Sequence, residues 1–355
     1  MLENSLNLPP LTLHELLGTN AASPEAVAWD AFVVTCPGAT FCHRAGWRQV
    51  IEAATGQSCF YRFVCRGGMI VGVLPLVHVR SPLFGNALIS NGFCVYGGIA
   101  ALDDQAAEAL AADATALGER LGVDYVELRH QAPRLDWPGR SDLYATFRRP
   151  LEADEARNFL AIPRKKRADI RKSIGNGLKL VVDADIDEFY NIYAESVRNL
   201  GTPVLPRRFF HQIKQSFGTD AEVLLVRDSA GPLAALIAFY FRDQVLPYYG
   251  GALPLARPVH AYDFLYWSLM SRATKRGVRV FDFGRSKRGT GAFDYKTFWG
   301  FTPEPLHYQY HLIRATEPPR INPLNPRYRW LVAAWQRLPL GIANRLGPVI
   351  ARGIG

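Results

Sequence analysis

Apolar and polar positions follow one another along the chain in a pattern that predicts strands and helices in turn. Residues 68–78 form an apolar run after a turn glycine, which is typical of a buried strand. A Cys-Val-Tyr-Gly-Gly follows at 94–98, and residues 103–121 then space their apolar positions as a helix does. That helix ends at a glycine, and residues 122–129 have the pattern of another strand.

The same order occurs a second time, about 155 residues further on. It runs through a strand at 231–241, a Pro-Tyr-Tyr-Gly-Gly at 247–251, a helix at about 258–276 and a strand at 277–285. Each of these features alone is common in α/β proteins, but the whole order rarely recurs by chance. The pattern therefore predicts two similar units in tandem.

The second unit has the more complete pattern. Residues 186–201 and 206–218 predict two helices, and residues 221–253 predict three strands joined by turns. We expect an α/β (α+β) fold in which each unit has a mixed central sheet flanked by helices. The expected division of the chain is a first unit at 1–150, a second unit with the active site at 151–313, and a basic amphipathic tail at 314–355.

The positive charge of the chain is concentrated in this tail. The 355 residues are 48% hydrophobic, which is enough for two globular domains, and the net charge is +9. Residues 314–355 carry +6 of it, so the body is only mildly basic, which excludes a dedicated binder of duplex DNA. Because the tail mixes Arg with Trp, Leu and Ile, we expect residues 320–355 either to contact the anionic surface of the inner membrane or to pack back on the domains.

The cysteines indicate a reducing compartment. They number five, stand at positions 36, 42, 59, 65 and 94, and have no Cys-x-x-Cys spacing, so we expect buried free thiols. We expect no metal and no resident cofactor. Because the N-terminus lacks a signal-peptide pattern and no apolar run approaches about 18 residues, we expect a cytoplasmic protein.

The stretch FDFGRSKRGTGAFDYKTFWGF, at 281–301, predicts a strand followed by a cationic, glycine-rich loop. It lacks the Lys of a phosphate-binding loop and shows no helix start behind the strand, which excludes a nucleoside-triphosphate site. Ser286 lies outside a Gly-x-Ser-x-Gly elbow, which excludes a serine hydrolase. Such a loop, with Arg285 in it, either holds an anion or a developing oxyanion or is a solvated hairpin.

Two residues of this stretch are candidates for chemistry. Asp282 points away from Phe281 and Phe283 because neighbours on a strand alternate faces, so we expect it in a site or paired with an Arg. Lys296 lies among aromatic residues, which can hold its ammonium in one geometry over a carbonyl oxygen.

A second cationic cluster, IPRKKRADIRKS, stands at the junction of the units, at 162–173. On a helix, Arg164, Arg167 and Arg171 share one face, with Lys165 beside them, and Asp169 falls on another face. This row is either a solvated face or a grip for phosphates at the cleft between the units.

The order of elements resembles the acyl-CoA N-acyltransferase (GNAT) superfamily, but one of its motifs is absent. In that superfamily the CoA pyrophosphate binds an Arg/Gln-x-x-Gly-x-Gly/Ala loop between a strand and the next helix. The corresponding residues 250–258 read GGALPLARP and lack this motif. The absence counts against acetyl-CoA as the acyl donor.

Several motifs together resemble the FemAB-like peptidyltransferases, tandem GNAT-like proteins that transfer an amino acid from aminoacyl-tRNA to an amine. More narrowly, the chain resembles the branch associated with exosortase/PEP-CTERM and exopolysaccharide systems. The motifs, within about residues 40 to 313, are at 75–91, 94–98, 147–150, 162–173, 194–210, 246–251, 263–267 and 281–301. The chain lacks the coiled-coil arm of some members, and this branch does not imply the wall-bridge substrates of the better-known ones.

The resemblance implies a site at the cleft between the units, aminoacyl-tRNA as donor, and an amine-bearing envelope or polysaccharide precursor as acceptor. Lys296 matches the lysine that this family places at the aminoacyl end, and Asp282 or Asp263 would orient the amine or take its proton. The other expected substrate-binding residues are Tyr248 and Tyr249 in the cleft, Arg285 and Ser286 in the loop, Arg198 and Thr202 at the acceptor, and Arg164, Lys165, Arg167 and Arg171 at donor phosphates.

Two other functions stay open at this point. One is an N-acyltransferase that uses acyl-CoA or an acyl-carrier protein, since the missing loop does not count against a carrier protein. The other is a non-catalytic tandem GNAT binding protein. Because Glu127 and Arg129 stand in the first copy where Asp282 and Gly284 stand in the second, we expect one active half.

Overall fold

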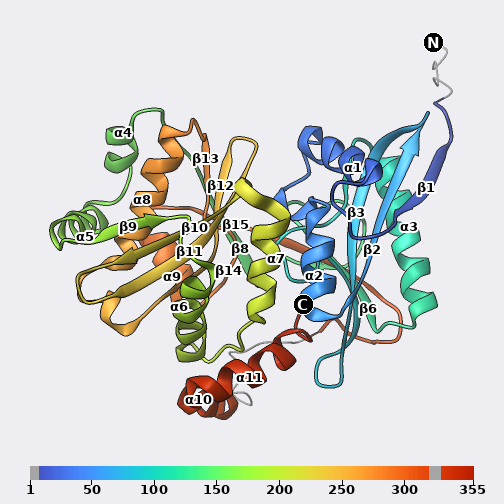
Figure 1. The fold of residues 1–355 in the computed structure, drawn as a ribbon. Coiled ribbons are helices and arrows are strands. Elements are labelled where there is room, and N and C mark those ends of the chain that lie inside the picture. The colour runs from blue at the N-terminus through green and yellow to red at the C-terminus, as the bar shows by residue number, and fades with distance from the viewer. Residues whose placement is uncertain (1–7, 320–328) are drawn as a thin grey trace.

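The computed structural model describes residues 8–319 and 329–355 and contains two mixed β-sheets flanked by helices, which confirms the expected fold class (Figure 1). The first part of the chain forms β1 (Leu11–Leu16), α1 (Pro24–Thr35), η1 (Phe41–His43), α2 (Gly46–Thr55), β2 (Ser58–Arg66), β3 (Met69–Ser81), β4 (Gly85–Ser90), β5 (Ala100–Ala101), α3 (Asp104–Leu121), β6 (Tyr125–His130) and β7 (Gly139–Arg140). The next part forms β8 (Tyr144–Pro150), α4 (Glu155–Leu160), α5 (Arg164–Gly175), β9 (Lys179–Val182), α6 (Ile186–Asn199), α7 (Arg207–Phe217), η2 (Gly218–Asp220), β10 (Ala221–Arg227), β11 (Pro232–Phe241), β12 (Gln244–Ala252), η3 (Pro254–Ala256) and α8 (Ala261–Lys275). The last part forms β13 (Val280–Asp282), β14 (Ser286–Lys287), α9 (Gly291–Phe298), β15 (Pro303–Pro305), β16 (His307–Leu312), α10 (Arg329–Arg337) and α11 (Leu340–Ala351).

The two sheets have the same internal order, which confirms the repeat expected from the sequence. In the first sheet β2, β3 and β4 are antiparallel, β4 pairs with β6 in parallel, and β16 closes the sheet against β6. In the second sheet β10, β11 and β12 are antiparallel, β12 pairs with β13 in parallel, and β8 closes the sheet against β13. The parallel pairs are connected by α3 and α8, because a parallel connection needs a crossover element.

Each sheet is completed by a strand that the chain order would assign to the other unit: β8 joins the second sheet and β16 joins the first. β8 lies before the second unit's helices in the chain and pairs with β13, with Asp282 opposite Arg148. β16 follows the second unit and returns to the first sheet, with Tyr310 opposite Glu127. The expected division of the chain at residue 150 is therefore not the division between the sheets. The apolar pattern identifies strands, but it does not specify which distant strand each one pairs with.

The segment after β13 contains a helix that the sequence analysis did not expect. α9 begins after Thr290, whose side-chain oxygen accepts a hydrogen bond from the amide of Phe293 at 3.4 Å. A threonine at this position satisfies one of the free amides of a first helical turn, so it starts a helix even beside Gly291. The expectation of a continuous loop was wrong, and Lys296 lies on α9.

Aromatic packing of η1 and α2 against β11 and α7 fixes the two units against each other. Phe41 of the first unit stacks on Phe239 of the second, with ring centroids 4.3 Å apart, and Trp47 lies 5.1 Å from Phe217. All four side chains are buried, and each buried aromatic removes about 150–250 Å² of surface from water. All five cysteines are buried and free, as expected.

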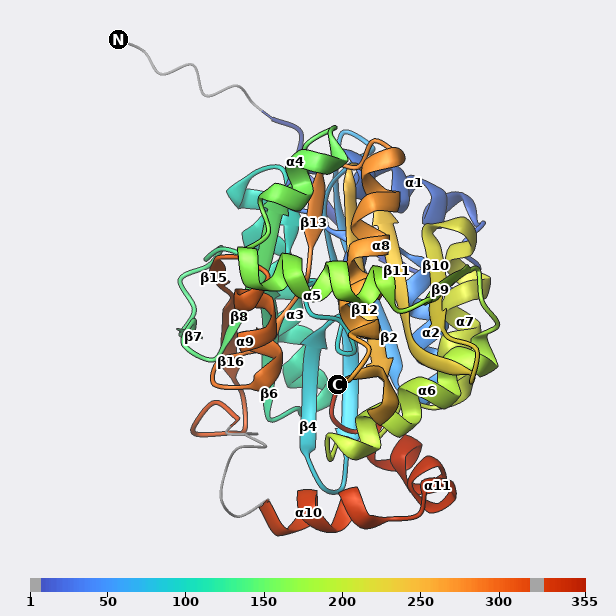
Figure 2. The ribbon, with the colours of Figure 1, turned by 90° about the vertical axis from the view of Figure 1, so that its left-hand side faces the viewer.

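The described part of the tail packs on the body, at one end of the molecule (Figures 1 and 2). Arg198 of α6 donates to the carbonyl of Gln336 in α10 at 3.0 Å, and Gln57 donates to the carbonyl of Arg352 at 2.8 Å. Residues 329–355 thus pack back on the domains, while contact of the tail with a membrane stays a prediction; residues 320–328 lie outside the described chain. Among the helices that are described, none combines the length and the apolar character needed to span a bilayer.

Candidate active site

The second sheet opens between β12 and β13. These strands pair at two positions, Gln244 with Val280 and Val245 with Phe281, and then diverge. A bulge in the pairing of β11 with β12 leaves Tyr248 without an opposite residue, and its hydroxyl accepts from the amide of Val95 in the first unit at 2.7 Å. Tyr249 packs into the buried aromatic cluster that includes Phe209 and Phe210. Both tyrosines thus lie beyond the point of divergence, and Tyr248 meets the first unit there.

Asp282 ends β13 and is fully enclosed between the two units. Its carboxylate accepts from the amide of Gly284 at 2.7 Å and from the hydroxyl of Tyr96, in the first unit, at 3.2 Å. The hydroxyl of Thr146 on β8 lies 3.3 Å away and also hydrogen-bonds to that of Tyr96. Burial raises the pKa of the Asp282 carboxyl, and the hydrogen bond from Gly284 opposes that shift. The raised pKa makes this carboxylate a stronger proton acceptor than an exposed one.

Lys296 reaches the same strand end from α9. Its ammonium donates to the carbonyls of Gly284 at 2.9 Å and Arg285 at 3.0 Å, and it lies 5.4 Å from the ring centroid of Phe147. This confirms the aromatic surroundings expected for it. Burial lowers the pKa of Lys296 to about 7, the charge of Asp282 opposes this shift, and that of Arg285 adds to it. An amine near neutrality beside a buried carboxylate can hold or transfer a proton.

The backbone amides of the loop between Asp282 and Lys296 bind other groups than we expected. The amide of Gly284 donates to Asp282, and the amide of Arg288 donates to the carbonyl of Leu143 at 3.0 Å. These two amides are therefore not available to an oxyanion, contrary to the expectation that the loop amides face it. The guanidinium of Arg285 turns to the hydroxyl of Tyr308 at 2.7 Å. Ser286 is buried, and its hydroxyl has no hydrogen-bond partner among the described residues.

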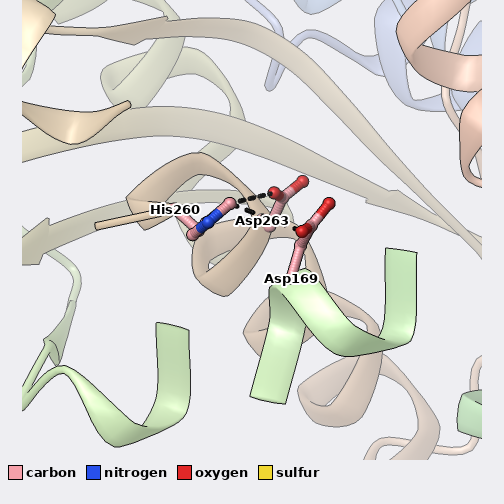
Figure 3. A group of neighbouring side chains, drawn as sticks. All are labelled: Asp169, His260 and Asp263. Atoms are coloured by element: carbon pink, nitrogen blue, oxygen red, sulfur yellow. Dashed lines mark ion pairs between the residues drawn. The ribbon is translucent and has the colours of Figure 1, made fainter. Parts of the chain in front are cut away.

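Asp263 belongs to a second group, which lines a pocket of about 770 Å³ beside the start of α8. Its carboxylate accepts from the hydroxyl of Tyr295 at 2.7 Å and from the ammonium of Lys166 at 3.0 Å. His260 lies 3.5 Å from Asp263 and 4.0 Å from Asp169 (Figure 3). Because Tyr295 and Lys296 are neighbours on α9, they point in different directions, so the helix separates Asp263 from Lys296.

Asp169, His260 and Asp263 carry side-chain atoms that can ligate a metal ion, but the ammonium of Lys166 already lies between the two carboxylates. The ligand atoms of Asp169, His260 and Asp263 lie within 4.8 Å of one another. The ammonium of Lys166 lies 3.4 Å from Asp169 and 3.0 Å from Asp263, so this one cation pairs with both carboxylates. His260 has a backbone φ of 53°, a left-handed conformation that is rare for a residue with a side chain.

The basic row at 162–173 lies on α5, as expected for a helix. Arg171 covers the ring of Phe159 at 5.1 Å, and Lys165 lines a smaller pocket of about 310 Å³ between α5 and α9. In the described chain no ion pair includes Arg164, Lys165, Arg167 or Arg171, so this row is available to phosphates.

Arg198 and Thr202 lie at the end of α6, away from these groups. Arg198 donates to the tail at Gln336, and the amide of Thr202 closes the helix end on the carbonyl of Val197 at 2.9 Å. The structure does not bring either residue together with Asp282 or Lys296.

The sequence analysis missed four residues of these groups: Tyr96, Lys166, His260 and Tyr295. The sequence did single out the position of Tyr96, because its Tyr-Gly-Gly motif matches the motif that begins with Tyr249. Lys166 and His260 each stand three residues before an aspartate, which places both pairs on one side of a helical turn.

Comparisons with known proteins agree with this architecture. Residues 164–297 match the family model of the acetyltransferase (GNAT) domain, and no curated protein matches the chain significantly. FemX aligns over 90% of this chain and 100% of its own, with a TM-score of 0.65 and 14% identity. A tandem GNAT protein from the clavulanic acid biosynthesis pathway aligns over 85% of this chain and 98% of its own, with a TM-score of 0.53 and 15% identity.

A third solved structure is the C-terminal domain of an Agrobacterium fabrum protein described as a lysylphosphatidylglycerol synthetase. It aligns over 81% of this chain and 91% of its own, with a TM-score of 0.53 and 10% identity. At these identities the likeness concerns the fold. The chain consists of two tandem GNAT-like units, arranged as in FemX.

Proposed function

We propose that this protein is an N-acyltransferase of the FemAB type, which transfers an amino acid from aminoacyl-tRNA to an amine. The observation that carries the proposal is the buried pair of Asp282 and Lys296 at the end of β13, where the second sheet opens toward the first unit. A carboxylate with a raised pKa and an amine with a lowered one are the two proton-handling groups that such a transfer needs.

The proposed reaction uses each group once. The acceptor amine attacks the ester carbonyl carbon, a C–N bond forms, and Asp282 takes the proton that the nitrogen loses. Lys296, in its protonated form, donates its remaining N–H to the developing oxyanion. The C–O bond of the ester then breaks, and the leaving ribose hydroxyl takes up the proton from Asp282. Because the ester is already activated, positioning supplies most of the acceleration.

The pocket beside α8 supports a donor other than CoA. In GNAT-like units the loop between the strand corresponding to β12 and the helix corresponding to α8 is where a CoA pyrophosphate binds. Here the pocket beside that loop is lined by Asp169 and Asp263 together with Lys166 and Arg257, so it offers a pyrophosphate no excess of positive charge. The unpaired cations of α5 offer a place for the phosphates of an RNA instead.

The acceptor follows from the resemblance alone. We propose an amine-bearing envelope or polysaccharide precursor, of the kind handled in exosortase/PEP-CTERM and exopolysaccharide systems, and a cytoplasmic enzyme. An acyl-carrier donor remains the alternative for the donor, and a non-catalytic tandem GNAT protein remains the alternative for the activity. In the first unit, a closed ion pair of Glu127 with Arg129, at 2.7 Å, stands at the position of Asp282, which supports one active half.

The experiment that tests this function is transfer of a labelled amino acid from tRNA to a panel of amino sugars and amine-bearing precursors. Products are identified by mass spectrometry. We expect an amide product with the wild type and at least about a hundredfold less with Lys296→Met or Asp282→Asn, while Lys179→Met, exposed on the edge strand β9, retains transfer. Transfer that persists unchanged in Lys296→Met, or that requires acetyl-CoA, would contradict the proposal.

A further inference from the structure

The last helix of the chain turns its small residues inward and its large apolar residues outward. Ala343, Gly347 and Ala351 are buried against the body. Ile342, Leu346 and Val349 lie on the opposite side, and their exposed fractions are 46%, 47% and 58%. A helix that only covered the body would be expected to have the reverse arrangement, because burying large aliphatic side chains stabilises most.

The packing of α11 fixes this orientation. A Cβ at Gly347 would meet the backbone nitrogen of Val204 at 3.0 Å, so the body accepts only a small residue there. Beyond the helix, a Cβ at Gly353 would clash with the side chain of Ser81. Rotating α11 to bury Ile342 or Leu346 would place a large side chain against these contacts. No described residue covers these outward apolar side chains, so they stay in solvent unless a partner covers them.

More apolar residues lie at the same end of the molecule. Leu83, at the turn between β3 and β4, has 74% of its surface exposed and lines one pocket with Val349. Trp330 and Leu331 of α10 are also exposed, and α10 lies beside α11 at this end in both views (Figures 1 and 2). We call the surface made by Leu83, Trp330, Leu331, Ile342, Leu346 and Val349 the tail face.

The charged residues that the tail itself contributes, within residues 329–355, have one sign. Arg337, Arg345 and Arg352 are exposed on α10 and α11 or just after it, and residues 329–355 contain no Asp or Glu. Arginines around exposed Leu, Ile, Val and Trp are the composition of a helix that lies in the interface of an anionic bilayer. A second copy of this chain fits less well, since a symmetric contact would bring the same arginines together.

We propose that the tail face docks on the surface of an anionic lipid bilayer, with α10 and α11 lying along it. The aliphatic side chains of α11 and Leu83 enter the interface, Trp330 sits at the headgroup level, and the arginines contact lipid phosphates. This inference does not depend on the proposed transfer reaction, because none of its residues belongs to the groups around Lys296 or Asp263.

The test is flotation of the purified full chain with vesicles of phosphatidylcholine, alone or with about 30% phosphatidylglycerol. We expect binding to the anionic vesicles only. Val349→Asp should lower the bound fraction at least about tenfold, since it places a charge at the interface. Val27→Asp is the matched control, because Val27 is 57% exposed on α1, at the other end of the molecule, and should bind like the wild type. Arg345→Gln should weaken binding about fivefold, the effect of one cation near such a surface.

Two results would overturn the proposal. One is a wild-type protein that stays at the bottom of the gradient with anionic vesicles at moderate salt. The other is self-association, measured by sedimentation without lipid, that Val349→Asp abolishes and Val27→Asp does not, because the tail face would then be covered by a second copy. Thermal unfolding of each variant checks that the folded body is intact.

Discussion

Replacing Lys296 by methionine should change how the stability of this protein depends on pH. The side chain is 9% exposed, and its burial lowers the pKa from 10.5 to about 7. In the unfolded chain the amine returns to water and keeps the higher value. Between pH 7 and 10.5 the unfolded state therefore binds a proton that the folded state does not, and the free energy of unfolding of the wild type rises with pH.

The size of the effect follows from the difference between these two pKa values. A difference of about 3.5 units corresponds to about 5 kcal/mol over the whole window, or about 1.4 kcal/mol for each pH unit. Methionine has nearly the same length and no titrating group. From pH 7, where the folded lysine is still half protonated, to pH 9 the wild type should therefore gain about 2.3 kcal/mol relative to Lys296→Met. The variant also leaves the carbonyls of Gly284 and Arg285 without their donor, but that cost is present at every pH in this range.

Urea unfolding followed by tryptophan fluorescence at pH 7, 8 and 9 measures the difference directly. Lys172→Met is the control: this lysine is exposed on α5, and its ammonium is hydrated in the folded and the unfolded chain. A difference between wild type and Lys296→Met that stays constant from pH 7 to pH 9 would refute the reasoning, because the lysine would then keep its proton in the folded protein.

Three further changes test other parts of the account. Asp282→Asn should lower the rate of transfer at saturating substrate about 10²–10⁴-fold with little change in KM, because the acceptor amine loses its base; an unchanged rate would remove Asp282 from the mechanism. The double change Arg167→Gln with Arg171→Gln should weaken tRNA binding and reduce the slope of log affinity against log salt by about 1.5 to 2, as measured by titration at several salt concentrations; an unchanged slope would mean that α5 faces only water. Gly347→Ala should lower the free energy of unfolding by about 1 kcal/mol, since its Cβ meets backbone, whereas Gly341→Ala on the same helix has open space and should not destabilise the protein; equal effects in thermal unfolding would contradict the close packing of the tail.

Local signals in the sequence predict the second sheet and its helices well. Residues 186–201, 206–218 and 221–253 were expected to be two helices and three strands, and they form α6, α7 and the strands β10, β11 and β12. Helical spacing and a capping aspartate, Asp185, are properties of neighbouring residues, so one stretch contains the whole signal. The repeat adds the order of the sheet, because each copy supports the other.

What the sequence does not predict depends on contacts between distant residues. The exchange of β8 and β16 is set by packing between the units, and no local pattern encodes it. The separation of Asp263 from Lys296 arises because α9 forms where a loop was expected, so that Tyr295 and Lys296 point to different groups. Asp282 was expected in a site or paired with an Arg. It stands opposite Arg148 on β8, and one of its side-chain hydrogen bonds comes from Tyr96 in the other unit, which no local pattern predicts.

The central claim, that the opening of the second sheet receives an aminoacyl ester rather than an acyl thioester of CoA, is tested most directly by donor binding. Equilibrium binding of aminoacyl-tRNA, uncharged tRNA and acetyl-CoA to the purified protein would be measured at moderate salt. The account predicts tighter binding of charged than of uncharged tRNA, loss of that preference in Lys296→Ala but not in Lys172→Ala, and no comparable binding of acetyl-CoA. Binding of acetyl-CoA without any preference between the two tRNA forms would contradict it.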